Sequence, residues 1–238
     1  MSEQVNGQSV NKLSPVSLLS KIFTDPQQAF ENIKVHPNWL IPIVLTLIYG
    51  FLFNYTTLQL QTEASRQLIM ESTKLNEEMK DKALEGIETQ TTFSTQIQPG
   101  ISAVAGTFLA PLIIALVLMV FGNFIYGGSA SFNVLFSASV WAGMIGLAEG
   151  IVKLPMMLSK GTLEIYTSLA LVMDLSESKT FLFQLLNLVD VFSIWKVFVY
   201  STAFIVIYKV SATKSYATII SLYLIYSFVL IGIMQLFM

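Results

Sequence analysis

Five long apolar segments constrain the fold of this chain more than any other feature of its sequence. Each reaches the roughly 20 residues that an α-helix needs to cross the hydrocarbon core of a bilayer. We predict spans at residues 39–60, 99–126, 132–158, 189–210 and 216–238. Because 54% of the residues are hydrophobic and only 12% are charged, a water-soluble core could not bury this much apolar surface. The sequence therefore predicts an all-α fold, a polytopic integral membrane helical bundle.

Short connections predict how neighbouring spans pair. Residues 127–131 (GGSAS) join the second and third spans, and residues 211–215 (SATKS) join the fourth and fifth. Connections of this length make each pair an antiparallel helical hairpin. The longer loop at 61–98 lies outside the membrane and carries an amphipathic repeat, which predicts a helix capped by Asn76. Residues 159–188 form a second extramembrane piece on the same side.

The chain ahead of the first span contains two short amphipathic stretches bounded by prolines. Pro15 and Pro26 each follow a residue that can cap a helix, and Pro37 ends the second stretch. We divide the chain into a cytoplasmic N-terminal segment, residues 1–38, and a five-span membrane domain, residues 39–238. The N-terminal helices are predicted to be interfacial and to set the depth of the first span. Their predicted anchors are Phe23, Phe30 and Trp39.

Small residues recur every four positions in two of the spans. The third span carries Ala142, Gly146 and Gly150, and the second carries Ser102, Gly106 and Ala110. Such stripes let helix backbones approach closely in a membrane. We expect them to pack within the bundle, with a dedicated homodimer face as the alternative. Pro111 and Pro155 are expected to kink or end their helices locally.

Four charged residues lie within or beside the predicted spans. Glu149 and Lys153 are four positions apart, which favours an ion pair along one helix. Asp190 stands at the start of the fourth span, and Lys196 follows about two turns later. Together the four could form one polar cluster in the outer half of the bundle, and charge inside a membrane is a functional hypothesis. The alternative is that the lysines reach the headgroups and the acids neutralise them.

The sequence makes no case for catalysis or for a metal. It has no cysteine and a single histidine, His36, so a Cys-based zinc site, a multi-histidine site and a Cys–His pair are all unavailable. No Gly-x-Ser-x-Gly accompanies the histidine. A net charge of −2 offers no basic face to nucleic acid. We expect no catalytic residues, no metal or cofactor, no nucleic-acid partner and no enzymatic activity.

Four local patterns follow one another along the chain. They are Ile22-Phe23-Thr-Asp-Pro26-Gln-Gln-Ala29-Phe30 with Pro37-Asn-Trp39-Leu-Ile-Pro42, then Gly127-Gly128-Ser-Ala-Ser131-Phe132 with Phe136-Ser137, then Asp190-Val-Phe192-Ser-Ile194-Trp195, and last Ser211-Ala-Thr-Lys214-Ser215. In this order they resemble the prokaryotic branch of the Yip family, membrane proteins named for Ypt/Rab interaction. The likeness covers nearly the whole chain from about Leu18.

The resemblance implies five spans, a cytoplasmic N-terminus and an outward C-terminus. The loop from Lys209 to Lys214, which has two bases and no acid, favours the same orientation. A prokaryotic plasma (inner) membrane is the expected location. The expected function is non-enzymatic organisation of membrane lipids or partner proteins, with the bilayer, other membrane proteins or a second copy as partners. The alternative is a transporter or channel for small molecules, ions or lipids that uses the polar cluster.

Overall fold

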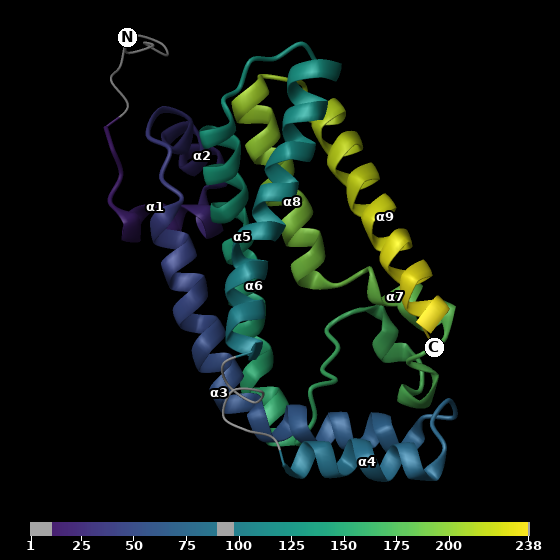
Figure 1. Cartoon of the computed structure of the whole chain (residues 1–238). Helices are drawn as coiled ribbons and strands as arrows, with labels where there is room; N and C mark the ends of the chain where they lie inside the picture. Colours follow the sequence, from purple (N-terminus) through teal and green to yellow (C-terminus); the bar gives the residue numbers. More distant parts are fainter. Residues whose placement is uncertain (1–10, 90–97, 238) are drawn as a thin grey trace. The chain divides into compact units, whose positions relative to one another are not determined.

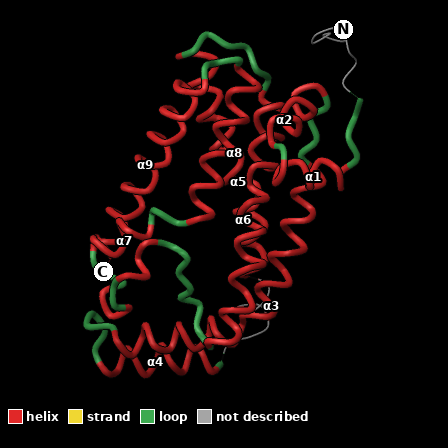
Figure 2. The backbone as a smooth tube through the Cα atoms, turned by 180° about the vertical axis from the view of Figure 1, so that it is seen from behind, coloured by secondary structure: helices red, strands yellow, loops and turns green. Residues whose placement is uncertain are grey.

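The computed structural model describes residues 11–89 and 98–237, and most of them are helical (Figure 1). The helical elements in chain order are α1 (Pro15–Thr24), α2 (Pro26–Val35), α3 (Leu40–Glu71), α4 (Glu77–Glu88), α5 (Gln98–Met119), the π-helix η2 (Val120–Ile125), α6 (Phe132–Lys160), the 3₁₀ turns η3 (Leu169–Val172) and η4 (Leu175–Glu177), α7 (Phe181–Asn187), α8 (Val191–Tyr208) and α9 (Ala212–Phe237). Within the described ranges there is no strand (Figure 2), only one isolated bridge between Ser168 and Asp190. The predicted all-α fold is confirmed.

Five helices are long and apolar enough to cross a membrane: α3, α5 continued by η2, α6, α8 and α9. This confirms the five predicted spans, but α3 continues to Glu71, well past the predicted end at residue 60. Hydroxyl side chains in this stretch donate to carbonyls one turn earlier, so the polar residues stay inside the helix. These residues are Thr56, Thr57, Thr62 and Ser65.

Two prolines lie inside membrane helices without ending them. Pro111 is within α5 and Pro155 is within α6, and both helices continue beyond the proline. An interior proline removes one backbone donor, which membrane helices tolerate when neighbouring groups satisfy the freed carbonyl. Neither proline therefore ends its helix, and the expectation that they kink their helices locally stays a prediction.

The caps of the short helices follow the sequence pattern. Ser14 caps α1, and Asp25 caps α2 through a bond from the N–H of Gln28, with proline in the first turn of each helix. Helix α2 ends at Val35, directly before His36 and Pro37. Asn76 likewise caps α4 by accepting from the N–H of Met79 at 2.8 Å. The starts predicted for these three helices are confirmed.

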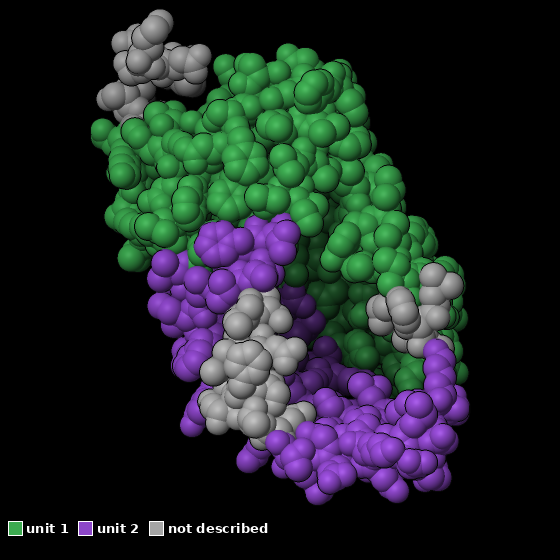
Figure 3. All heavy atoms as spheres, viewed as in Figure 1, with its two compact units in different colours: residues 1–43, 110–146, 166–238 green, residues 44–109, 147–165 purple. Residues whose placement is uncertain are grey.

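The chain divides into two compact units (Figure 3). Unit 1 comprises residues 1–43, 110–146 and 166–238, and unit 2 comprises residues 44–109 and 147–165. Unit 1 contains α1, α2, η2, α7, α8, α9 and the first half of α6. Unit 2 contains most of α3, all of α4 and the second half of α6. The proposed domain boundary at residue 38 stays a prediction.

In unit 1, helix α8 is the element around which the others pack. It contacts α9 on one side and α2 on another, and α1 packs on α2. Phe30 from α2 and Phe204 from α8 are essentially fully buried, as is Trp141 from α6. At the end of α8, the Lys34 ammonium donates to the carbonyls of Val206 at 3.2 Å and Ile207 at 2.9 Å. The N-terminal helices are thus part of the packed core of this unit.

The turn between α5 and α6 closes against Tyr208 of α8. The Tyr208 ring occupies the space beside Gly122 and Gly128 where a Cβ atom would lie. Its hydroxyl donates to the Leu118 carbonyl at 3.3 Å. The Asn123 side chain spans the turn, because its amide donates to the Ala130 carbonyl at 3.0 Å and its oxygen accepts from the Ala130 N–H at 3.1 Å. The GGSAS connection is therefore a shaped turn fitted to one aromatic ring.

Candidate intramembrane polar site

Glu149 and Lys153 form an ion pair on α6, within unit 2. The Lys153 ammonium lies 2.7 Å from Glu149 Oε1, with the lysine and glutamate side chains only 14% and 23% exposed, respectively. Positions i and i+4 face each other on a helix, and an acid N-terminal to the base is the better order. Each charge thus has its opposite within hydrogen-bond distance, which lowers the cost of holding both inside a bilayer.

Tyr49 of α3 brings a third polar group to the same part of unit 2. Its hydroxyl packs against Gly150, where a larger side chain would collide with it. It is close enough to Glu149 for the two groups to interact electrostatically. The hydroxyl oxygen is buried and has no hydrogen-bond partner among the described residues. A buried hydroxyl without a hydrogen bond is unusual in a folded protein.

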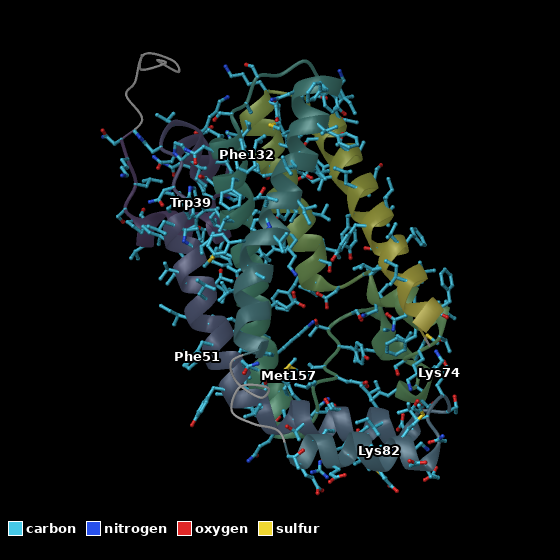
Figure 4. The ribbon with its side chains drawn as sticks, in the orientation of Figure 1. Trp39, Phe51, Lys74, Lys82, Phe132 and Met157 are labelled. Carbon is cyan, nitrogen blue, oxygen red and sulfur yellow. The ribbon has the colours of Figure 1, made fainter. Side chains whose placement is uncertain are left out.

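Further along the same helices, unit 2 contains a cavity of about 520 Å³. Its lining is Gly50, Phe53, Asn54 and Gln61 of α3, Met157 of α6 and Leu163. Phe51, one position from Gly50, points away from α3 and is 71% exposed (Figure 4). Small-molecule sites commonly measure about 300 to 1,000 Å³ and are mostly apolar with a few polar groups. The volume lies in that range, and Asn54 and Gln61 supply the polar groups, but the space is largely open to the surface rather than enclosed.

Asp190 belongs to unit 1, where it caps helix α8. Its Oδ1 accepts from the N–H groups of Phe192 at 2.8 Å and Ser193 at 3.4 Å, and its Oδ2 accepts from the Thr167 hydroxyl. The residue is 5% exposed and forms a backbone bridge with Ser168. An acid directly before an apolar helix is a typical N-cap. The carboxylate therefore already has a structural task that accounts for its burial.

Lys196 lies further along α8 and contacts the small-residue face of α6. Its Cε and Nζ atoms are 3.8 and 3.9 Å from the point where a Cβ on Gly146 would be. The glycine leaves room for the aliphatic part of the lysine, which can carry its ammonium toward a polar boundary. Lys196 is half-buried.

The four charged residues are split between the two units. Glu149 and Lys153 meet each other in unit 2, while Asp190 and Lys196 lie in unit 1 at the two places just described. A single cluster of four stays a prediction. Within residues 11–89 and 98–237, no group of three His, Asp or Glu side chains could hold a metal ion.

A comparison with protein families identifies the family of this chain. The sequence profile of the Yip1 domain matches residues 20–234, which is nearly the whole chain. The chain belongs to the Yip1 domain family. Together with the five apolar helices, this identifies an integral membrane protein. No curated protein and no solved structure matched the chain.

The small residues of this Yip1 domain have different surroundings on its two stripes. On α6, Ala142 is fully buried, Gly146 faces Lys196 and Gly150 faces Tyr49. On α5, no described atom lies within 4 Å of the place where a Cβ on Gly106 would be. Ala110 is also exposed, and the Ser102 side chain lies outside the described residues. The packing role of both stripes stays a prediction.

The three aromatic anchors of the Yip1 domain also contact protein. Phe30 is fully buried, and the Phe23 ring meets Trp195 edge-on with centroids 5.5 Å apart. Trp39, labelled in Figure 4, meets Phe136 edge-on at 5.7 Å. Their role as anchors at the membrane boundary stays a prediction.

Three residues of these sites were missed by sequence reasoning. No sequence pattern predicts the contacts of Tyr49 and Tyr208 with their glycine partners, because those glycines are far away in sequence. Lys34 had a weak signal, since a base in the last turn of a short helix commonly meets carbonyl groups. Here the carbonyls belong to a different helix, at Val206 and Ile207.

Proposed function

We propose that this Yip1-domain protein is a non-enzymatic membrane protein that holds a partner membrane protein against helix α5. We further propose that it belongs to the prokaryotic branch and lies in the plasma membrane with its N-terminus cytoplasmic. The main support for this proposal is that little of α5 is buried within the protein. Only 11% of its most apolar stretch is buried, against 56% for α6.

The exposed face of α5 has the features of a helix-docking surface. In unit 2, Leu109 is more than half exposed, and Gly106 leaves the backbone open beside it. Between helices in lipid, association depends on close backbone approach rather than on hydrophobicity, since lipid tails are as apolar as leucine. A bare glycine therefore favours a protein helix over lipid as the neighbour at this face.

The polar groups of the spans support a packing role over a transport path. Tyr200 donates to the Ser139 carbonyl at 3.2 Å, and Ser215 donates to the Ser201 carbonyl at 2.7 Å. The Glu149 carboxylate and the Lys153 ammonium also bind each other, at 2.7 Å. The two hydroxyl bonds join α8 to α6 and to α9, so these polar groups contribute to helix packing.

The test is affinity purification of the full chain from its native membranes, with Gly106→Leu as the variant. The matched control is Gly143→Leu, because Gly143 of α6 also has no described atom within 4 Å of its missing Cβ. We expect a partner that the wild type and Gly143→Leu retain and that Gly106→Leu loses. A partner set unchanged by Gly106→Leu would remove the basis of the proposal.

Transport is the second candidate, favoured by the cavity of unit 2 and by the buried Tyr49 hydroxyl near Glu149. Reconstitution into liposomes separates the two candidates. The docking proposal predicts solute flux and lipid scrambling at the level of protein-free liposomes. Flux above that level that is lost in Glu149→Gln would instead establish transport through unit 2.

A further inference from the structure

A small polar cavity lies in unit 1 where the N-terminal segment and the start of α3 meet α6. Its volume is about 140 Å³, and its polar lining is Lys12, Asn32, His36 and Asn38, with Trp141 beside them. One water molecule needs only about 10 to 15 Å³ measured in this way, so a tetrahedral anion and some water fit together. None of the lining residues belongs to α5, so a ligand in this cavity is independent of the proposed docking of a partner on that helix.

Asn32 fixes the wall that carries the lysine. It is 3% exposed, and its amide donates to the Asn11 carbonyl at 2.9 Å while its oxygen accepts from the Leu13 N–H at 3.3 Å. These two bonds hold the backbone on both sides of Lys12. A buried amide that grips the chain around an exposed lysine positions that lysine at the cavity.

The opposite wall is fixed by Trp141 and by the beginning of α3. The indole N–H of Trp141 donates to the Asn38 carbonyl at 2.6 Å, and Asn38 Oδ1 accepts from the Leu40 N–H at 3.2 Å. Because that oxygen is engaged by the backbone, the side-chain NH₂ of Asn38 is the group that can donate to a ligand. Both polar walls are held by groups in the protein, so the site needs little rearrangement to receive one.

The charge of the lining selects the class of ligand. Lys12 supplies a full positive charge, the Asn38 amide supplies N–H donors, and no acid is found among the described residues that line the cavity. Lysine is a common phosphate binder, acting as a point charge. Pro15 and Ile41 also line the cavity, so it borders the first turns of α1 and α3, whose backbone dipoles add to the attraction for an anion.

We propose that this cavity binds the phosphate of an anionic lipid headgroup. The lipid is preferred over free phosphate because α3 is a membrane span and Ile41 lies in its first turn. The cavity therefore lies at one end of a predicted span, which is the part of a membrane helix that lipid phosphates reach. Held there, one lipid ties the N-terminal segment to the first span.

The experiment measures binding of phosphatidic acid to the full-length protein in phosphatidylcholine nanodiscs. The test variant is Lys12→Met, and the matched control is Lys214→Met, which removes the same charge from another exposed lysine in unit 1. We expect Lys12→Met to bind about tenfold more weakly, from the loss of one charge-assisted hydrogen bond. Lys214→Met should bind like the wild type, and Lys12→Arg should keep most of the affinity.

Because Lys12 is exposed, a folding defect is not expected, and the melting temperature of each variant checks this. Equal affinity of Lys12→Met and wild type, or equal weakening by Lys214→Met, would overturn the proposal. A parallel titration with inorganic phosphate distinguishes the source. If phosphate binds in a Lys12-dependent manner and phosphatidic acid does not, the assignment to a lipid headgroup is wrong.

Discussion

The ring of Tyr208 lies in space that exists only because positions 122 and 128 are glycines. A Cβ at either position would overlap the ring, which is also held by Phe204 with centroids 4.8 Å apart. Gly127 between them has a φ of +69°, a conformation that strongly favours glycine. The sequence marked this stretch as a turn, but the aromatic partner could not be deduced, since it comes from a helix some eighty residues later in the chain.

We predict that Gly122→Ala destabilises the protein by about 1 to 3 kcal/mol, because the added methyl overpacks a filled site. Thermal unfolding in detergent, followed by intrinsic fluorescence, measures the effect. In a Tyr208→Ala background the same substitution should cost far less. The control is Gly143→Ala, where no described atom is near and alanine should be neutral or stabilising. Equal costs for Gly122→Ala in both backgrounds would show that Tyr208 is not the cause.

Only some contacts of the polar residues could be predicted from the sequence. The spacing of Glu149 and Lys153 predicts their pairing, because helix geometry alone brings positions four apart together. The contact between Tyr49 and Gly150 could not be predicted, because it joins two helices whose facing surfaces the sequence does not specify. Contacts within one helix follow from periodicity, whereas contacts between helices depend on packing.

Side-chain hydrogen bonds stabilise helix α8 at both of its ends. Asp190 caps its start, and the Lys34 ammonium binds carbonyls at its end. The sequence located this helix to within two residues at each end, since an apolar run of this length predicts a membrane span. The partner at the far end was not predictable, because it belongs to a helix near the N-terminus.

We predict that Asp190→Ala lowers stability by about 0.5 to 2 kcal/mol, the usual loss for an N-cap. Asp190→Asn should lose less, because asparagine also caps helices and can still accept from the N–H of Phe192. Thermal unfolding of the two variants makes the comparison. If both lose the same stability, the carboxylate charge rather than the cap is what matters.

We predict that Lys34→Met lowers stability by about 1 to 2 kcal/mol, because it leaves the carbonyls of Val206 and Ile207 without their charged donor. Lys21→Met on α1 is the control, since Lys21 pairs only with the exposed side chain of Gln28 in the described hydrogen bonds. Hydrogen exchange at the end of α8 should rise in Lys34→Met alone. An equal loss of stability in both variants would contradict a specific role for this contact.

At the scale of the whole molecule, the sequence predicted the five spans and the all-α fold, because bilayer thickness imposes segment lengths that can be read directly. It did not predict that α2 packs on α8, since an amphipathic helix shows the same pattern whether its apolar face meets lipid or protein. The site is harder still: the charged residues were visible, but Asp190 proved to be a cap and Glu149 a partner of Lys153.

The small buried share of α5 supports the proposal that this Yip1 domain holds a partner helix there. The most direct measurement places a photoreactive side chain at Leu109, which is 53% exposed, and irradiates native membranes. We expect a protein adduct of discrete mass that disappears when Gly106→Leu is added and persists with Gly143→Leu. Adducts to lipid alone, or a protein adduct indifferent to Gly106→Leu, would contradict it.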